Sequence, residues 1–339
     1  MKMTNSQYMK LAIDEAWKYQ LLTYPNPAVG ATIVKNNKVL STEAHKEAGT
    51  PHAEVLALKS AYLSVYPTSK LQQLESSHEI HEYLMSNHNN FFHECEIYVT
   101  LEPCNHIGKT PACSVLLEAV KIKKVYIGSL DPNDKASGGL ERLQNADIDV
   151  EIDVCKDESD KLLFPFLQYQ KKHFHFFKMA MRGDGSINNG YITTQDSLNL
   201  VHEIRTKIDL MVIGGNTIRI DRPTLDARFS ANKKAPDIFI YSRQKEFDKS
   251  IPLFQIKKRD IMIGTNLDYV SSNSFVMYEG GYQFLNALKD KIDYLMLFIS
   301  CQVTETLPLD VSKFGFEIQH SYYINEFDKI VYLKRVNGE

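Results

Sequence analysis

The sequence lacks the features that mark membrane-spanning or secreted proteins. None of its apolar runs approaches the roughly 18 residues that a transmembrane helix requires. Its N-terminal stretch mixes lysines and carboxylates with apolar positions, unlike a signal peptide. The five cysteines are an odd number and do not indicate a disulfide framework. We therefore expect a soluble, cytoplasmic protein whose thiols stay reduced.

The sequence also lacks a basic signature, internal repeats and low-complexity tracts. Its net charge of −3 gives no indication of a nucleic-acid partner, and nothing in it suggests a membrane partner. A length of 339 residues suggests roughly two domains of about 150 residues each. We expect these domains over residues 1–150 and 173–339, with a connecting helix or linker over residues 151–172.

Three residues of the first half have the chemistry of zinc ligands: His52, Cys104 and Cys113. Three protein ligands leave the fourth tetrahedral position open to water, and zinc lowers the pKa of that water from about 15.7 to about 7. Glu54 follows His52 by two positions and is a poor competitor for the metal, but it can move a proton from the water to a leaving amine. The pattern predicts a zinc-dependent deaminase with Glu54 as its catalytic residue.

Two other interpretations of these residues remain open. They could form a structural zinc site, which normally closes with a fourth cysteine or histidine. No obvious fourth ligand is present, because Cys95 lies in another stretch and His106 lies inside the loop between the two cysteines. They could also be unrelated buried residues.

The spacing of the two cysteines resembles one family. Eight residues separate Cys104 from Cys113, not the two of the common P-C-x-x-C pattern. The loop P-C-x-H-x-G-x-T-P-x-C is similar to the deaminase domain of the bifunctional riboflavin-biosynthesis deaminase–reductases, the RibD family. This resemblance implies a cytidine-deaminase-like α/β/α sandwich. It also implies a set of residues that contact the deaminase substrate: Asn26, His45, His106, Lys109 and Thr110.

Strands and helices alternate in the first half, which indicates a layered α/β structure. A helix is expected over 6–20, capped by Asn5 or Ser6, followed by a hairpin of 31–34 with 39–42 across Asn36-Asn37. A second helix should start at Thr50 or Pro51 and carry His52, and a third should begin at Pro111 with Thr110 as its cap. Strands are expected over 97–101 and 124–129, and further helices over 139–144 and 156–171.

Residues 62–94 do not fit the family, whose connection at this point is shorter. Short helices are expected over 71–74 and 78–85. The segment contains four histidines, His78, His81, His88 and His93. Histidine-rich tracts can bind metal, but the irregular spacing favours surface positions. The sequence does not show whether the insertion covers the deaminase site or mediates contacts.

The second half alternates strands with glycine pairs. Strands are expected over 174–181, 209–213 and 275–278, and Gly214-Gly215 and Gly280-Gly281 follow the last two. Such junctions can approach a phosphate, although simple turns have the same composition, and the G-x-G-x-x-G fingerprint is absent. In order along the chain, these motifs resemble the reductase domain of the same family. The resemblance implies a dihydrofolate-reductase-like α/β fold that uses NADPH.

The resemblance also assigns residues to the reductase site. Those expected against the nucleotide are Met181, Tyr191, Thr217, Asp221, Ser242 and Gly281; those expected against the substrate are Lys178, Asn189, Arg205, Leu225, Arg228 and Glu279. Guanidinium groups bind phosphates bidentately, which suits the two arginines. The segment 184–191 departs from the family by being shorter and by ending in a tyrosine where the family usually has tryptophan.

Together these features predict a multifunctional enzyme of riboflavin biosynthesis with zinc and NADPH as cofactors. It would deaminate 2,5-diamino-6-ribosylamino-4(3H)-pyrimidinone 5′-phosphate and then reduce the ribosyl group to a ribityl chain. The resemblance implies a homo-oligomer, dimer or tetramer. The alternatives are a deaminase with an impaired reductase domain, a nucleic-acid base deaminase, and a zinc-stabilised scaffold without turnover.

Overall fold

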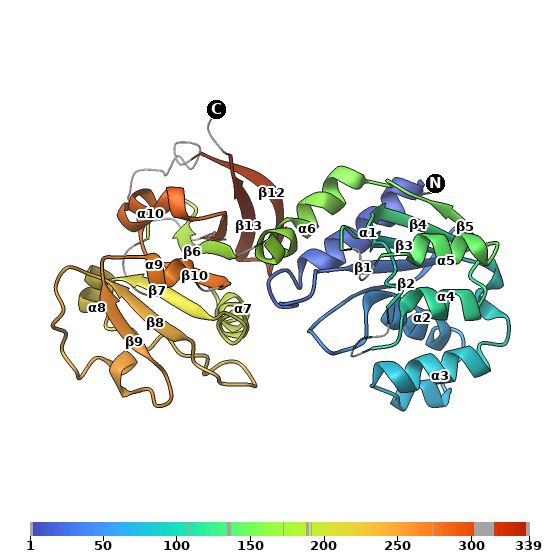
Figure 1. The fold of residues 1–339 in the computed structure, drawn as a ribbon, viewed down its shortest axis with the longest axis horizontal. Helices are drawn as coiled ribbons and strands as arrows, with labels where there is room; N and C mark the ends of the chain where they lie inside the picture. Colours follow the sequence, from blue (N-terminus) through green and yellow to red (C-terminus); the bar gives the residue numbers. More distant parts are fainter. Residues whose placement is uncertain are drawn as a thin grey trace. The chain divides into compact units, whose positions relative to one another are not determined.

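The computed structural model divides the chain into two compact units, Met1–Phe166 and Leu167–Glu339 (Figure 1). The change from one unit to the other falls inside α6 (Lys156–Lys171), which matches the helix expected over 156–171. No described helix is long and apolar enough to cross a membrane. The structure describes residues 3–106, 108, 110–133, 137–171, 173–187, 190, 192–272, 274–301 and 315–336.

The first unit is built on a mixed sheet of five strands in the order β2-β1-β3-β4-β5. The strands β1 and β2 pair antiparallel, as do β1 and β3, whereas β3, β4 and β5 run parallel. The strands are β1 (Gly30–Lys35), β2 (Lys38–Ala44), β3 (Cys95–Leu101), β4 (Lys124–Ser129) and β5 (Asp149–Glu151).

The predicted hairpin is confirmed. Asn36 and Asn37 link β1 to β2 with φ angles of 51° and 65°. Two successive left-handed residues match the twist of the flanking strands, and asparagine tolerates this conformation better than most residues. The first helix begins slightly earlier than predicted, because Thr4, and not Asn5 or Ser6, caps it through a reciprocal capping box with Gln7.

Helices cover both faces of this sheet. Helix α1 and the first part of α6 pack on one face, where Gly30 lies against the Ala12 carbonyl and Gly128 lies against Ser159, too close to admit a Cβ atom. The other helices supply core residues from the opposite face. The helices of this unit are α1 (Asn5–Trp17), α2 (Ala53–Leu63), α3 (Ser77–Asn87), α4 (Cys113–Ala119) and α5 (Gly139–Asn145), with 3₁₀ turns η1 (Lys70–Gln73) and η2 (Phe91–Glu94).

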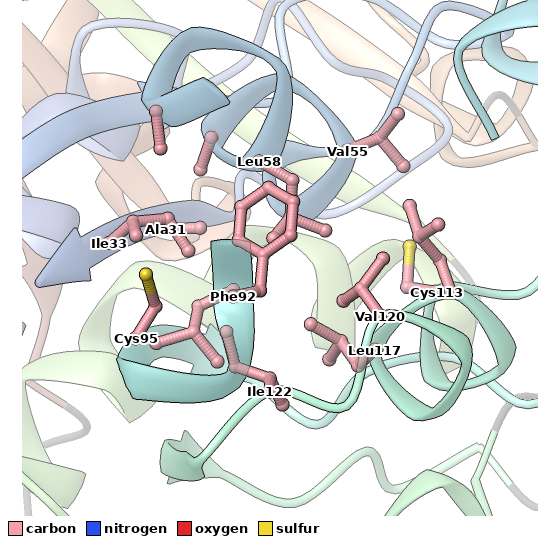
Figure 2. Packing of buried hydrophobic residues seen from close by; sticks show 14 of the residues in the cluster. Ala31, Ile33, Val55, Leu58, Phe92, Cys95, Cys113, Leu117, Val120 and Ile122 are labelled. Carbon is pink, nitrogen blue, oxygen red and sulfur yellow. The ribbon is translucent and has the colours of Figure 1, made fainter. Parts of the chain in front are cut away.

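The segment 62–94 is part of the core of the first unit and not an appendage to it. Five of its apolar side chains are buried in the same cluster as α2 and α4, namely Leu71, Ile80, Leu84, Phe91 and Phe92. Figure 2 shows the Phe92 ring among Ala31, Leu58 and Val120. The expectation that its histidines lie on the surface is wrong for His81, which is only 2% exposed. Burial lowers the pKa of His81 to about 4, so its ring is neutral at pH 7.

The second unit contains an eight-stranded sheet in the order β12-β13-β11-β6-β10-β7-β8-β9. The six strands from β11 to β9 are parallel, and β13 and β12 add an antiparallel edge. The strands are β6 (Phe174–Arg182), β7 (Leu210–Gly214), β8 (Asp237–Tyr241), β9 (Ile261–Gly264), β10 (Phe275–Glu279), β11 (Tyr294–Ser300), β12 (Phe316–Tyr323) and β13 (Asp328–Arg335).

The helices of the second unit follow the parallel strands. They are α7 (Gln195–Arg205), α8 (Gly215–Asp221), α9 (Asp268–Ser271) and α10 (Tyr282–Leu288), with 3₁₀ turns η3 (Pro252–Gln255) and η4 (Lys289–Lys291). The buried carboxylate of Asp328 fixes the start of α7, because it accepts hydrogen bonds from the Thr194 amide and hydroxyl and from the Ser197 hydroxyl. The three strands predicted from sequence correspond to β6, β7 and β10.

Candidate active sites

Three side chains of the first unit converge on one point. The Nδ1 atom of His52 lies 3.6 Å from Cys104 Sγ and 3.3 Å from Cys113 Sγ. Tetrahedral zinc with Zn–N near 2.1 Å and Zn–S near 2.3 Å separates the nitrogen and sulfur ligands by about 3.6 Å. The distances and the soft donor set therefore fit zinc. Among the described residues, this is the one cluster of at least three histidine, cysteine or carboxylate side chains that could hold a metal.

The local fold of each ligand differs from the prediction in two details. His52 is the N-cap of α2 and does not lie inside the helix. Helix α4 begins at Cys113 with Ala112 as its N-cap, so the prediction of a start at Pro111 capped by Thr110 is wrong. The Cys113 amide points at the Cys104 sulfur, 3.4 Å away. A short turn after β3 and the first residue of α4 thus place both thiols on one centre.

Thr110 contacts one of the predicted metal ligands and does not cap α4. Its hydroxyl lies 3.2 Å from His52 Nε2, on the side of the ring opposite the sulfur atoms. When Nδ1 binds a metal, Nε2 carries the proton and donates it to the Thr110 oxygen, which fixes the tautomer and the ring orientation. Thr110 therefore supports the metal ligand directly.

The electrostatics of the site favour a thiolate beside a protonatable carboxyl. The hydrogen bond from Cys113, helped by His52, lowers the pKa of the Cys104 thiol well below its usual value. Burial raises the pKa of Glu54 to about 7, and this carboxyl is only 4% exposed. A bound cation would lower that pKa again, because opposite charge favours the ionised form. Glu54 lies one residue into α2, next to the cluster.

Asn26 and His45 join the same site. The amide nitrogen of Asn26 lies 3.1 Å from His45 Nε2, and His45 Nδ1 lies 3.2 Å from the Pro51 carbonyl. The rings of His45 and His52 are 5.2 Å apart. Burial lowers the pKa of His45 to about 4, so the neutral ring donates from Nδ1 to Pro51 and accepts from Asn26 at Nε2. The structure thus brings these two predicted substrate residues beside the metal ligands.

The remaining predicted deaminase residues differ in their placement. His106 is exposed on the loop between the two cysteines. It lies within electrostatic range of Asp131, whose pKa is raised by burial. Lys109 lies outside the described residues.

Sequence reasoning gave no role to Glu102, although it precedes Pro103 in the zinc motif. Its buried carboxylate accepts hydrogen bonds from the Asp131 amide at 3.2 Å and from the Gly138 and Leu140 amides at 3.0 Å. These bonds tie the segment after β4 and the start of α5 to the motif. The sequence around Glu102 cannot reveal these backbone partners, because they lie some thirty residues further along the chain.

In the second unit, Lys178, Arg205 and Glu279 form one largely buried ion network. Glu279 Oε1 lies 3.2 Å from Lys178 Nζ, and Oε2 lies 3.0 Å from Arg205 Nη2. Glu279 ends β10 and is paired in register with Lys178 of β6, which explains their meeting. Burial alone would raise the pKa of Glu279, but the two cations outweigh it and lower the pKa to about 2.

The guanidinium groups of the two predicted phosphate-binding arginines differ in their exposure and in the hydrogen bonds that they already make. Arg205 is buried and already bonded, since Nη1 also donates to the Asp226 carbonyl at 3.1 Å. Arg228 is exposed, and its Nη1 lies 2.8 Å from Asp226 Oδ1. Between them in the chain, Leu225 is buried with a φ of 55°. Arg228 is therefore the arginine with the accessible guanidinium.

The predicted nucleotide residues line the ends of neighbouring parallel strands. Gly281 caps α10 after β10, and a Cβ atom there would meet Ile187 at 2.8 Å. Gly215 of α8 lies against Ser242, which follows β8. Thr217 is in α8, and Asp221 ends that helix with a pKa raised by burial and by the charge of Glu279. The Met181 sulfur lies 3.7 Å from the Tyr282 hydroxyl. Asn189 and Tyr191 lie outside the described residues.

Comparison with known proteins identifies the family of the chain. Residues 2–129 match the model of the cytidine and deoxycytidylate deaminase zinc-binding region. The riboflavin biosynthesis protein RibD of Aquifex aeolicus is 30% identical over 299 residues, which cover 84% of this chain and 76% of that protein. The chain belongs to the RibD family. RibD of Synechocystis is 32% identical over 211 residues, covering 60% of this chain and 50% of that protein.

Solved structures of RibD proteins have the same fold. A deaminase/reductase of this type from Thermotoga maritima is 25% identical, with a TM-score of 0.63, over 98% of this chain and 99% of its own. Acinetobacter baumannii RibD gives a TM-score of 0.62 at 24% identity over the same shares. The predicted fold class, a cytidine-deaminase-like sandwich followed by a dihydrofolate-reductase-like domain, is confirmed. As a RibD-family member, the chain is an enzyme with a deaminase half and a reductase half.

Proposed function

We propose that the chain catalyses two consecutive steps of riboflavin biosynthesis. The first unit deaminates 2,5-diamino-6-ribosylamino-4(3H)-pyrimidinone 5′-phosphate, and the second unit reduces the ribosyl group of the product to a ribityl chain. The observation that carries the first step is the convergence of His52, Cys104 and Cys113 beside Glu54. Membership of the RibD family supports the order of the two steps and the choice of substrate.

In the deaminase half, His52, Cys104 and Cys113 would hold one zinc ion. A zinc ion bound there supplies a Lewis acid that makes water nucleophilic near neutral pH. The Glu54 carboxyl then takes a proton from the attacking water and delivers it to the departing amine. Its buried position keeps this proton from exchanging freely with solvent.

Asn26 and His45 orient the pyrimidine in this proposal. Because His45 Nδ1 is held by the Pro51 carbonyl and its Nε2 accepts from the Asn26 amide nitrogen, the Asn26 side chain is held in one orientation beside the metal ligands. Fixed polar groups bind the edge of a base with little loss of side-chain entropy. His106 and Lys109 are the candidates for the ribose phosphate, since their loop lies between the two cysteines.

In the reductase half, NADPH supplies a hydride for C1′ of the ribose when it is bound. Met181, Thr217, Asp221, Ser242 and Gly281 are the described residues proposed to hold the nucleotide. Lys178 pairs with Glu279 and can also donate a hydrogen bond to a sugar oxygen. Leu225 and Arg228 would contact the substrate, and the guanidinium of Arg228 is suited to bind its phosphate group.

One assay tests both steps on the same preparation. The purified full-length protein receives the diaminopyrimidine phosphate with or without NADPH, while ammonia release and absorbance at 340 nm are followed together. Ammonia should appear in both conditions, and NADPH should be oxidised only after ammonia release begins. Ammonia release without NADPH oxidation would mean that the chain is a deaminase without reductase activity. Absence of ammonia release would refute the first step. Cytoplasmic location and homo-oligomeric state stay predictions; the mass of the purified protein in solution tests the second.

A further inference from the structure

Three consecutive backbone carbonyls of the second unit accept hydrogen bonds from two arginines. Both terminal nitrogens of Arg259 lie 3.2 Å from the Thr224 carbonyl, and Nη2 also lies 2.6 Å from the Leu225 carbonyl. The next carbonyl, that of Asp226, accepts from Arg205. Arg259 comes from the loop before β9, more than thirty residues further along the chain. The segment 224–226 is therefore held from outside its own sequence.

This segment needs such support because of its backbone conformation. Leu225 has a φ of 55°, in the left-handed region that a bulky side chain avoids. Hydrogen bonds from a charged donor are roughly twice as strong as those from a neutral one. Burial lowers the pKa of Arg259 to about 10, which leaves the guanidinium protonated at pH 7. A lysine would hold the two carbonyls less rigidly, since its ammonium lacks the planar fork of donors of a guanidinium.

The same segment is joined to the reductase site. Asp226 connects through its carbonyl to Arg205, which pairs with Glu279, and its carboxylate pairs with Arg228. Leu225 and Arg228 are residues that the proposed function places against the ribosyl substrate. Arg259 contacts the backbone beside them, so it can act on the substrate only through their placement.

We propose that Arg259 is a positioning residue of the reductase, which fixes the Thr224–Leu225 backbone so that Leu225 and Arg228 meet the substrate. This inference rests on the proposed reductase function. Loss of Arg259 lets Leu225 relax from its left-handed conformation and displaces both side chains. Because those contacts are present in the ground state and the transition state alike, the loss should raise KM and leave kcat nearly unchanged.

The test uses the full-length enzyme with Arg259→Gln and Arg259→Lys. The KM for the deaminated substrate should rise roughly ten-fold in Arg259→Gln and less in Arg259→Lys, with kcat and the KM for NADPH within about two-fold of wild type. Deaminase turnover on the same chain reports that the first unit is intact. Lys258→Gln is the matched control, because this exposed neighbour lies in the same loop and should leave all constants unchanged.

Chemical rescue separates positioning from general stability. Arg259 lines an open cleft of about 560 Å³, so a small guanidinium compound can reach the vacated position in Arg259→Ala. Millimolar ethylguanidinium should restore the substrate KM of this variant and leave that of Lys258→Gln unchanged. Backbone amide exchange should also rise over residues 223–228 in Arg259→Gln.

An Arg259→Gln enzyme with a wild-type substrate KM would overturn the proposal, as would a parallel loss of kcat and both KM values without rescue. If even Arg259→Lys unfolds the second unit, Arg259 is structural and the proposal is wrong. A wild-type enzyme that never oxidises NADPH would instead refute the reductase function, and unaltered exchange over 223–228 in Arg259→Gln would then still refute the role given to Arg259.

Discussion

The deaminase and reductase halves bring charged groups together in opposite ways. In the first half, His52, Cys104 and Cys113 place three metal-binding atoms within 4.8 Å of one another, a set that only a cation completes. In the second half, Lys178 and Arg205 both pair with the single carboxylate of Glu279, and the register of β6 and β10 brings Lys178 beside it. The first site is thus organised for an added cation, whereas in the second the one carboxylate is already paired with two cations of the chain itself.

This difference has a consequence for mutation. A substitution beside the metal ligands should remove one reaction and leave the fold largely intact, because the surrounding core is apolar. A substitution within the buried ion network should change both activity and stability, since it leaves a buried charge without its partner.

The largest expected effect is that of Glu54→Gln on deamination. Glutamine keeps the shape of the side chain but cannot take a proton, so ammonia release should fall roughly 1,000-fold, within the range for a general acid–base. Zinc content and NADPH oxidation with the deaminated intermediate should stay at wild-type levels. Glu151→Gln, on the distant strand β5, is the control and should keep full turnover. Full turnover of Glu54→Gln would remove its assigned role.

The second effect concerns the insertion and the stability of the first unit. Phe92→Ala should lower the free energy of unfolding of this unit by about 3–5 kcal/mol, because it leaves a cavity in the core that α2 and α4 share. Met85→Ala, at an exposed position of the same insertion, should change it by less than about 0.5 kcal/mol. Denaturant unfolding followed by loss of deaminase activity makes the comparison. Equal unfolding midpoints for the two variants would mean that the segment 62–94 does not contribute to the core of the first unit.

The third effect is the acid sensitivity of the reductase half. The pKa of Glu279 is lowered from 4.5 to about 2 in the folded state. The folded state therefore binds fewer protons than the unfolded state, and the stabilisation is complete above pH 4.5 and is lost as the pH falls towards 2. It amounts to at most about 3 kcal/mol, since the carboxylate is 21% exposed. The stability difference between wild type and Glu279→Gln should shrink over this window. A difference that is independent of pH would contradict the ion network.

The smallest effect is that of Thr110 on zinc. Thr110→Val removes the oxygen that accepts from His52 Nε2, and zinc affinity should fall roughly ten-fold, the lower end for such supporting groups. Thr110→Ser keeps the hydroxyl and should retain wild-type affinity. Competition with a chromogenic chelator measures both. Equal affinities for the valine and serine variants would show that the contact does not orient His52.

The sequence predicted the parts of the molecule that follow local rules or ligand chemistry. The histidine–glutamate pair and the two cysteines were identifiable because zinc accepts few side chains in few spacings, and the hairpin was identifiable because asparagines tolerate its turn. The same reasoning failed at Thr110. Its position before Pro111 is typical of a cap, but the structure uses its hydroxyl for His52 and starts α4 later.

The parts that depend on long-range contacts could not be predicted. Glu102 and Arg259 bind backbone groups some thirty residues away, and the sequence cannot single out such partners because every residue has the same backbone groups. The buried side chains of the insertion, such as Phe92, follow no regular period that would have shown them to be core. Arg205 matched a family position, yet only the structure shows that its guanidinium is committed to Glu279 and Asp226.

The central claim is that His52, Cys104 and Cys113 bind one zinc ion and leave its fourth position to an exchangeable small ligand. X-ray absorption at the zinc edge of the purified protein tests this directly. The claim predicts one zinc per chain with two sulfur atoms near 2.3 Å, one imidazole nitrogen and one further light atom that a small anion can replace. A third sulfur, a second imidazole that no anion displaces, or a protein that binds no zinc would contradict it.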